Sequence, residues 1–81
     1  MRAFYTKRFL ESYADAPAEI QRAVDRRIAL LLQSLRHPSL RAKKHDEARD
    51  LWQARANGGW RFYFRIEGDA YHLIDLIPHP K

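Results

Sequence analysis

The spacing of the apolar residues changes once along this chain, and that change constrains the fold more than any other feature of the sequence. Over residues 17–35 the apolar residues recur every three or four positions, the period of a helix buried on one side. From Leu51 onward they recur at every second position, the period of a strand with one covered face. The sequence therefore predicts helices followed by a sheet, which is an α+β fold.

The first half of the chain is predicted to contain a short strand and two helices. Residues 2–5 can form an edge strand, and Thr6 has the side chain of a helix N-cap. Asp15 followed by Pro17 is typical of a second helix start, with Asp15 as the cap and the proline in the first turn. Because the connection is short, the helices are expected to form an antiparallel hairpin. The apolar residues expected to be buried on them are Phe9, Leu10, Tyr13, Ile20, Val24, Ile28, Leu31, Leu32 and Leu35.

The second half is predicted to be a small antiparallel sheet. Residues 41–50 are polar, charged and aperiodic, so they are expected to form a loop. Strands are expected over 51–56, 60–67 and 70–77, separated by two glycine-containing turns. The predicted order is β-α-α-β-β-β in a single domain spanning 1–81, with the helix hairpin packed on the sheet.

Alternation in the strand over 60–67 divides its side chains between two faces. The large apolar side chains, which need burial against the helices, are Trp60, Phe62, Phe64 and Ile66. The opposite face carries Arg61, Tyr63, Arg65 and Glu67. Arg55 in the preceding strand is expected to lie on that same side. The sequence thus predicts one open sheet face that is basic and carries an aromatic ring.

The register of the last strand depends on the turn that precedes it. A two-residue turn would place His72, Ile74 and Leu76 on the basic face. A three-residue turn would instead place Tyr71, Leu73 and Asp75 there. The three-residue turn is preferred, because it sends Asp75 rather than Ile74 beside the arginines and leaves Ile74 and Leu76 in the core.

Charge and composition narrow the class of protein. The formal net charge is +5 and the sequence pI is near 10, which favours a polyanionic ligand or an acidic protein partner. There is no cysteine, so disulfides and thiolate metal sites are excluded and a cytoplasmic location is expected. No apolar run approaches the ~20 residues of a membrane helix, and the first residues lack the pattern of a signal peptide. The four histidines show no compact ligand spacing, so neither a metal nor another cofactor is expected.

The stretch 51–64, LWQARANGGWRFYF, resembles the RelE/ParE toxin superfamily of type II toxin–antitoxin systems. The shared pattern is an aromatic residue, a basic residue, a glycine turn, and then an aromatic residue followed by Arg, a hydrophobic residue and Tyr. The opening strand, the helix hairpin that ends at His37-Pro38, and the final His79 and Lys81 also fit. The resemblance covers nearly the whole chain and implies a RelE-like fold.

The resemblance also implies roles for individual residues. Arg61 matches the arginine that contacts the scissile phosphate in the ribonucleases of the superfamily, and Arg55 lies where the preceding strand offers a second basic group. His79 matches the segment where a histidine, arginine or lysine assists, so Arg55, Arg61 and His79 are the expected catalytic residues, with His79 as proton carrier. The residues expected to bind RNA are Lys43, Lys44, Tyr63, Arg65 and Lys81. The chain departs from the pattern at Gln53, where some members carry lysine, and it has no tyrosine after the last strand.

Three functions are compatible with this resemblance. The leading hypothesis is a metal-free endoribonuclease that cleaves messenger RNA on the ribosome and so inhibits translation. The second is a ParE-like inhibitor of DNA gyrase, and the third is a degenerate relative without toxicity. Under the first two, the expected partner is a cognate antitoxin protein, which would also set the oligomeric state.

Overall fold

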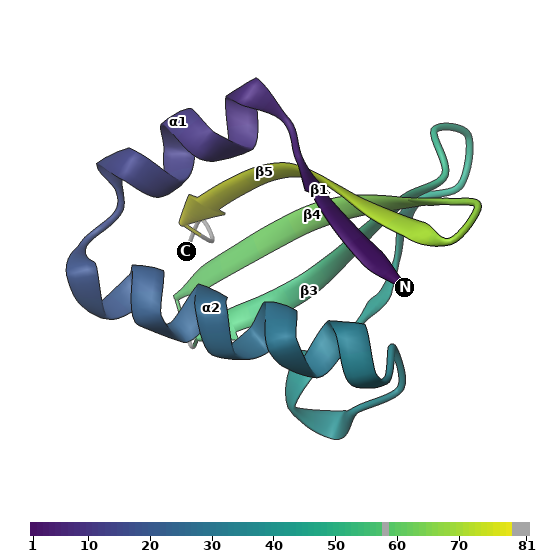
Figure 1. Cartoon of the computed structure of the whole chain (residues 1–81), viewed down its shortest axis with the longest axis horizontal. Helices are drawn as coiled ribbons and strands as arrows, with labels where there is room; N and C mark the ends of the chain where they lie inside the picture. Colours follow the sequence, from purple (N-terminus) through teal and green to yellow (C-terminus); the bar gives the residue numbers. More distant parts are fainter. Residues whose placement is uncertain (58, 79–81) are drawn as a thin grey trace.

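The computed structural model of the chain describes residues 1–57 and 59–78. It contains two α-helices, a short 3₁₀ helix and one five-stranded sheet (Figure 1). The elements are β1 (Arg2–Tyr5), α1 (Lys7–Asp15), α2 (Ala18–Gln33), the 3₁₀ helix η1 (Pro38–Leu40), β2 (Lys43–Asp46), β3 (Leu51–Asn57), β4 (Trp60–Glu67) and β5 (Ala70–Pro78). The α+β fold and the order of the predicted elements are confirmed. No helix in the described ranges is long and apolar enough to cross a membrane.

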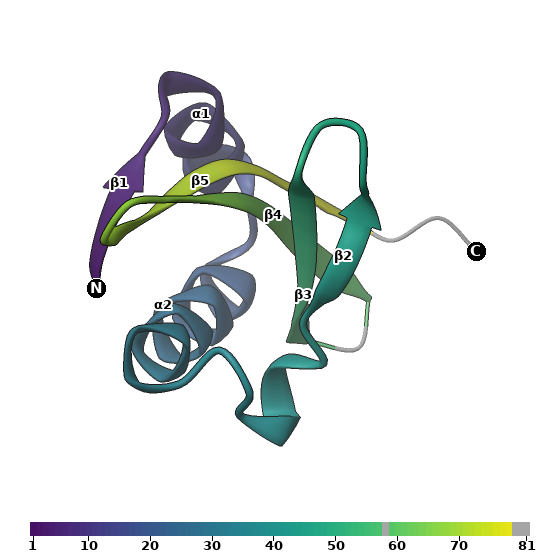
Figure 2. The ribbon, with the colours of Figure 1, turned by 90° about the vertical axis from the view of Figure 1, so that its right-hand side faces the viewer.

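The sheet has the strand order β1-β5-β4-β3-β2. β1 runs parallel to β5, and the other neighbouring pairs are antiparallel. α2 packs on β3 and α1 lies along β5, which leaves the other side of the central strands uncovered (Figures 1 and 2). We call the side that packs against the helices the covered face, and the side that carries Arg55, Arg61, Tyr63 and Arg65 the open face.

The covered face forms the core. Phe62 and Phe64 of β4 are fully buried, as the alternation in this strand predicted. They pack with Phe9 of α1 and with the buried stripe of α2, which consists of Ile20, Ala23, Val24, Ile28 and Leu31. Leu40 of η1 completes the cluster. Two residues predicted to be buried are instead exposed, namely Leu10 of α1 and Leu32 of α2.

The helix starts agree only in part with the sequence prediction. Thr6 is the N-cap of α1, and its Oγ1 accepts a hydrogen bond from the Phe9 N–H at 3.2 Å. Asp15 is not the cap of α2, because it is still the last helical residue of α1. Pro17 takes the N-cap position with extended backbone angles and no side-chain cap. The acidic residue near this helix start is instead Glu19, in the first turn of α2.

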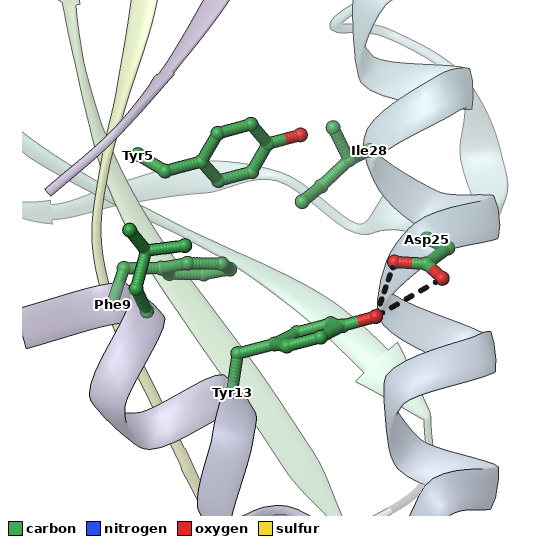
Figure 3. A pocket seen from close by; sticks show the side chains of 6 residues that line it. Tyr5, Phe9, Tyr13, Asp25 and Ile28 are labelled. Atoms are coloured by element: carbon green, nitrogen blue, oxygen red, sulfur yellow. Dashed lines mark hydrogen bonds between the residues drawn. The ribbon is translucent and has the colours of Figure 1, made fainter. Parts of the chain in front are cut away.

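The two helices are tied together by side chains near this connection. Tyr13 of α1 donates its hydroxyl hydrogen to the Asp25 carboxylate of α2, with oxygen distances of 2.9 and 3.1 Å (Figure 3). The Gln21 side chain donates to the Tyr13 carbonyl at 2.7 Å. These bonds link the two helices near their connection, beside the buried residues Ala16 and Ile20.

The prediction of a loop over 41–50 was wrong in one place. Lys43–Asp46 forms β2, which pairs with the first residues of β3 at the edge of the sheet (Figure 2). The strand lacks apolar alternation because an edge strand with one solvated side does not need to bury large side chains. Lysines on such a strand also oppose pairing with another chain.

The register of β5 combines both of the alternatives considered from the sequence. Glu67 pairs with Ala70 across a two-residue turn, so the preference for a three-residue turn was wrong. Ile74 is then the extra residue of a bulge, after which Asp75 pairs with Tyr63 as preferred. The bulge allows both Leu73 and Leu76 to reach the core, while Asp75 still lies on the open face. Tyr71 is likewise buried rather than on the basic side, and Ile74 lies outside the buried core.

Candidate functional site

The open face places the predicted arginines next to each other. Arg55 of β3 and Arg61 of β4 are direct partners in the antiparallel register, and both are half-buried. Tyr63 lies two residues further along β4, opposite the buried Gln53. Arg65 follows on the same face and is exposed. The prediction of a basic face with an aromatic ring is therefore confirmed by the strand register.

The electrostatic surroundings of Arg55 are unusual. The positive charge of Arg41 lowers the pKa of Arg55, and burial, Arg61 and Arg27 act in the same direction. Arg55 Nε is buried and has no hydrogen-bond partner among the described residues. Nearby like charges and an unsatisfied donor both disfavour the cation in the free protein. A bound oxyanion would remove both penalties at once.

A shallow depression of about 280 Å³ opens on the same face beside this pair. Its lining residues come from α1, β2, the loop after β2 and the three following strands. They are Arg8, His45, Arg49, Leu51, Tyr63, Ile74, Asp75 and Ile77. Ile77 is the register partner of Arg61, so the depression adjoins the arginine pair. The site therefore combines a proton-carrying imidazole, a phenol and several guanidinium groups.

His45 and Tyr63 face each other across this depression. Their ring centroids are 5.1 Å apart, and the rings meet edge to face. His45 is exposed, and Tyr63 is half-buried on β4. Histidine is the side chain whose ordinary pKa lies closest to neutrality, so it is well suited to take up and release a proton. The pair therefore provides the two kinds of proton-transfer group that an acid–base reaction needs.

Asp75 is held by α1 rather than by the arginine pair. Its Oδ1 accepts hydrogen bonds from the Ser12 hydroxyl at 2.7 Å and from the Leu76 N–H at 2.8 Å. Its Oδ2 lies 2.9 Å from Arg8 Nε. Asp75 therefore forms an ion pair with Arg8, which lines the same depression. The open face still carries more basic than acidic side chains, which favours an external anion.

The remaining predicted site residues fall into three groups. Lys43 lies opposite Gln53 on the exposed edge strand, on the side of the open face. Lys44 points the other way, because its Nζ lies 5.1 Å from the Trp52 ring centroid and is bonded to Asp50. Lys44 therefore does not lie on the open face, and its role in RNA binding stays a prediction. His79 and Lys81 lie outside the described residues.

Sequence reasoning missed His45 and Arg41 as members of the site. Both fall in the stretch predicted to be a loop, where the sequence could not show on which face of the sheet a side chain lies. Had β2 been recognised, alternation would have placed Lys43 and His45 on one side and Lys44 on the other. Within residues 1–57 and 59–78, no three His, Asp or Glu side chains come together as metal ligands do.

The sequence matches no family model and no curated protein. The structure, in contrast, is similar to several solved toxin structures. A YoeB/ParE toxin from Agrobacterium tumefaciens superposes with a TM-score of 0.82 at 15% identity, covering 99% of this chain and 100% of that one. The isolated E. coli RelE toxin gives 0.78 at 12% identity, covering 99% and 85%. RelE in the RelB–RelE complex of Methanococcus jannaschii gives 0.76 at 17%, covering 93% and 88%. The chain therefore has the fold of the RelE/ParE toxins.

Proposed function

We propose that this chain is the toxin of a type II toxin–antitoxin system and that it cleaves messenger RNA on the ribosome without a metal ion. The observation that carries the proposal is the pairing of His45 with Tyr63 in a depression that adjoins Arg55 and Arg61. An inhibitor that acts only by binding another protein does not need proton-transfer groups beside an oxyanion site. The shared fold with toxins supports the proposal but does not by itself assign an activity.

Metal-free RNA cleavage has three chemical requirements. The 2′-hydroxyl must lose its proton as its oxygen attacks the phosphorus, the charge on the five-coordinate phosphorane must be stabilised, and the leaving 5′-oxygen must gain a proton. The bond to the 5′-oxygen breaks, which leaves a 2′,3′-cyclic phosphate and a 5′-hydroxyl. No oxidant, reductant or second substrate is needed.

Arg55 and Arg61 would stabilise the phosphorane. Their planar guanidinium groups suit bidentate contacts with phosphate oxygens, and neither would act as a proton donor. A well-placed donor of this kind contributes on the order of 3–4 kcal/mol to transition-state stabilisation. The unsatisfied Nε of Arg55 would gain its missing partner at the same time.

We assign the proton transfers to His45 and Tyr63. His45 would accept the proton of the 2′-hydroxyl, and the Tyr63 hydroxyl would protonate the leaving oxygen. Arg49 lines the same depression and would add positive charge near the reacting groups. His45 thereby takes the proton-carrying role that the sequence assigned to His79. The role of His79 itself stays a prediction.

An antitoxin is the expected protein partner. The matching RelE chains from Methanococcus jannaschii and Pyrococcus horikoshii were solved as complexes with RelB. For this chain we propose a partner with an acidic segment, because the net charge of +5 and the open face favour a negatively charged surface. Such a segment would block the site by competing with RNA.

The test is induction of the chain in bacteria together with matched variants. We expect growth to stop with a rapid loss of protein synthesis and with new mRNA ends in translated regions. His45→Gln and Arg61→Ala should each lower cleavage by about 10²–10³-fold and restore growth. Arg26→Ala, an exposed arginine of α2, is the control and should remain toxic. Purified chain should cut mRNA in the presence of ribosomes and much less in their absence.

Other outcomes would contradict the proposal in different ways. Arrest of DNA replication with intact translation would favour inhibition of gyrase. Normal growth with folded, soluble chain would favour a relative without toxicity. If His45→Gln remained fully active, the proton-transfer assignment would be wrong even if cleavage itself occurred.

A further inference from the structure

The end of the β3–β4 hairpin carries more positive charge than contact with one phosphate requires. Arg55 and Arg61 already face each other across these strands. Arg41 and Arg27 are also close enough for their charges to act on Arg55. Since like charges repel, bringing these side chains together opposes folding. This accumulation needs an explanation beyond the reacting phosphate.

Arg41 reaches the cluster from the edge of the sheet. β2 begins at Lys43, which pairs with Gln53 of β3, and η1, which directly precedes Arg41, also contacts β3. Arg41 is exposed and directly follows η1, where its N–H donates to the Pro38 carbonyl at 3.3 Å. Neighbouring strands lie about 5 Å apart. Arg41 therefore lies near Arg55 on the side of β2, whereas Arg61 lies opposite Arg55 on β4.

The backbone of Arg41 is unfavourable for an arginine. Its φ of 47° and ψ of 43° lie in the left-handed region, which glycine adopts more easily than a residue with a Cβ. Strained residues of this kind occur where the surrounding structure holds a side chain for a function. The position thus gives a reason to look for a role of the guanidinium group rather than of the turn.

Arg27 holds the backbone around this cluster. Its Nε donates to the Ala56 carbonyl at 3.2 Å, and a terminal nitrogen donates to the Ser39 carbonyl at 3.3 Å. These bonds join α2 to the end of β3 and to η1, directly before Arg41. In the part of the chain that the structure describes, Arg27, Arg41 and Arg55 form no ion pair with a carboxylate.

From this geometry we propose that Arg41 and Arg55 form a second phosphate site, which binds the phosphodiester next to the scissile one in single-stranded RNA. The identity of the ligand as RNA rests on the proposed function. Arg61 and Arg55 contact the reacting phosphate, and Arg55 and Arg41 contact its neighbour. The RNA backbone then crosses the sheet from β4 towards β2 instead of following the strands.

The test measures binding to a short single-stranded RNA with 2′-O-methyl groups, which has no hydroxyl to react. The affinity is recorded by fluorescence anisotropy over a range of salt concentrations. For the wild type, the logarithm of the binding constant should fall with the logarithm of salt. Arg41→Gln should lower the affinity several-fold and reduce this slope by about 0.7, the value for one lost phosphate contact on a single strand. Arg41→Lys should keep the slope.

Two controls separate a phosphate contact from a general loss of charge or fold. Arg22→Gln removes an exposed arginine of α2 and should leave the slope unchanged. Arg41→Gly relieves the left-handed backbone, so its thermal midpoint should equal or exceed that of the wild type while the slope still decreases. Equal slopes for the wild type and Arg41→Gln, or equal losses for Arg41→Gln and Arg22→Gln, would overturn the second site.

A neutral methylphosphonate in the RNA locates the contact. Replacing the phosphate beside the cleavage position should weaken binding to Arg41→Gln by less than it weakens binding to the wild type, because only the contact with Arg55 is then left to lose. Additive losses would overturn the pairing of Arg41 with that phosphate. The binding test uses an RNA that cannot be cut, so its result does not depend on cleavage. Absence of cleavage in the earlier test would refute the proposed function but would leave the second phosphate site to be decided by the binding test.

Discussion

The two sides of the sheet carry two depressions of opposite character. The one between α1 and α2, about 170 Å³, is lined by Tyr5, Phe9, Leu10, Tyr13, Asp25 and Ile28 (Figure 3). Two of its polar groups, Tyr13 and Asp25, bond to each other, and no cationic side chain lines it. The depression on the open face is lined by two arginines, His45, Tyr63 and a carboxylate that α1 already satisfies. Only the second is lined by cationic side chains that could bind an anion.

This difference shows how one strand serves both stability and ligand binding. Consecutive residues of β4 alternate between the buried cluster and the open face. Burial of Phe62 and Phe64 stabilises the fold, whereas Arg61 adds to a cluster of like charges. Packing on the covered face therefore stabilises the fold. Part of that stability offsets the repulsion between the charged groups on the open face.

The largest difference in unfolding free energy is expected between substitutions of two adjacent residues of β4 whose side chains point to opposite faces of the sheet. Phe64→Ala should lower the free energy of unfolding by about 3–5 kcal/mol, because it leaves a cavity between the sheet and the helices. Arg65→Ala, one residue further along β4, should change it by less than about 0.5 kcal/mol. Urea unfolding measures both values. Similar losses for the two variants would break the distinction between the faces.

A smaller loss is expected at Thr6, which links α1 to the bulge of β5. Its Oγ1 caps α1, and its hydroxyl donates to the Leu73 carbonyl at 2.8 Å. Thr6→Ala removes both interactions and should cost about 1–2 kcal/mol in urea unfolding. Thr6→Ser keeps the hydroxyl and should retain most of that stability. A Thr6→Ser variant as unstable as Thr6→Ala would show that the methyl group matters instead.

The bond between the helices should contribute less. Tyr13→Phe removes the exposed hydrogen bond to Asp25 and should cost less than about 1 kcal/mol. That bond, with burial and the Asp25 charge, raises the pKa of Tyr13, so the folded state retains the proton more strongly. Its contribution is complete below the ordinary tyrosine pKa of about 10 and disappears as the pH rises through the higher folded value. The difference in unfolding free energy between wild type and Tyr13→Phe should therefore be larger at pH 9 than at pH 11.

The smallest expected change is a gain in stability on the open face. Repulsion from Arg41, together with burial and two further arginines, lowers the pKa of Arg55, so the charged form is disfavoured in the folded chain. Arg55→Gln removes that charge and should raise the thermal midpoint slightly in low salt. The gain should shrink as salt screens the remaining charges. A lower midpoint at every salt concentration would mean that packing by the Arg55 stem outweighs the repulsion.

The parts of the fold that could be predicted are those that bury large side chains. The helical stripe around Val24 and the alternation of Phe62 and Phe64 each identify a buried face, because a shift of one residue would expose them. β2 could not be found in this way, since Lys43–Asp46 buries no large apolar side chain. His45 and Arg41 were missed with it. The site was therefore predicted where it lies on β3 and β4 and missed where it depends on the edge strand.

By itself, the sequence determined the helix hairpin, the strand β4 and the basic character of the open face. Apolar periodicity and the arginines at alternate positions are local patterns. In any fold of this class they indicate which side chains are buried and which share one face of a strand. The tertiary structure decided which groups meet: the bulge at Ile74 that turns Asp75 towards Tyr63, the contact of His45 with Tyr63, and the approach of Arg41 to Arg55. Each of these joins segments far apart in the chain. Their proximity depends on strand order and register, and no local pattern encodes either.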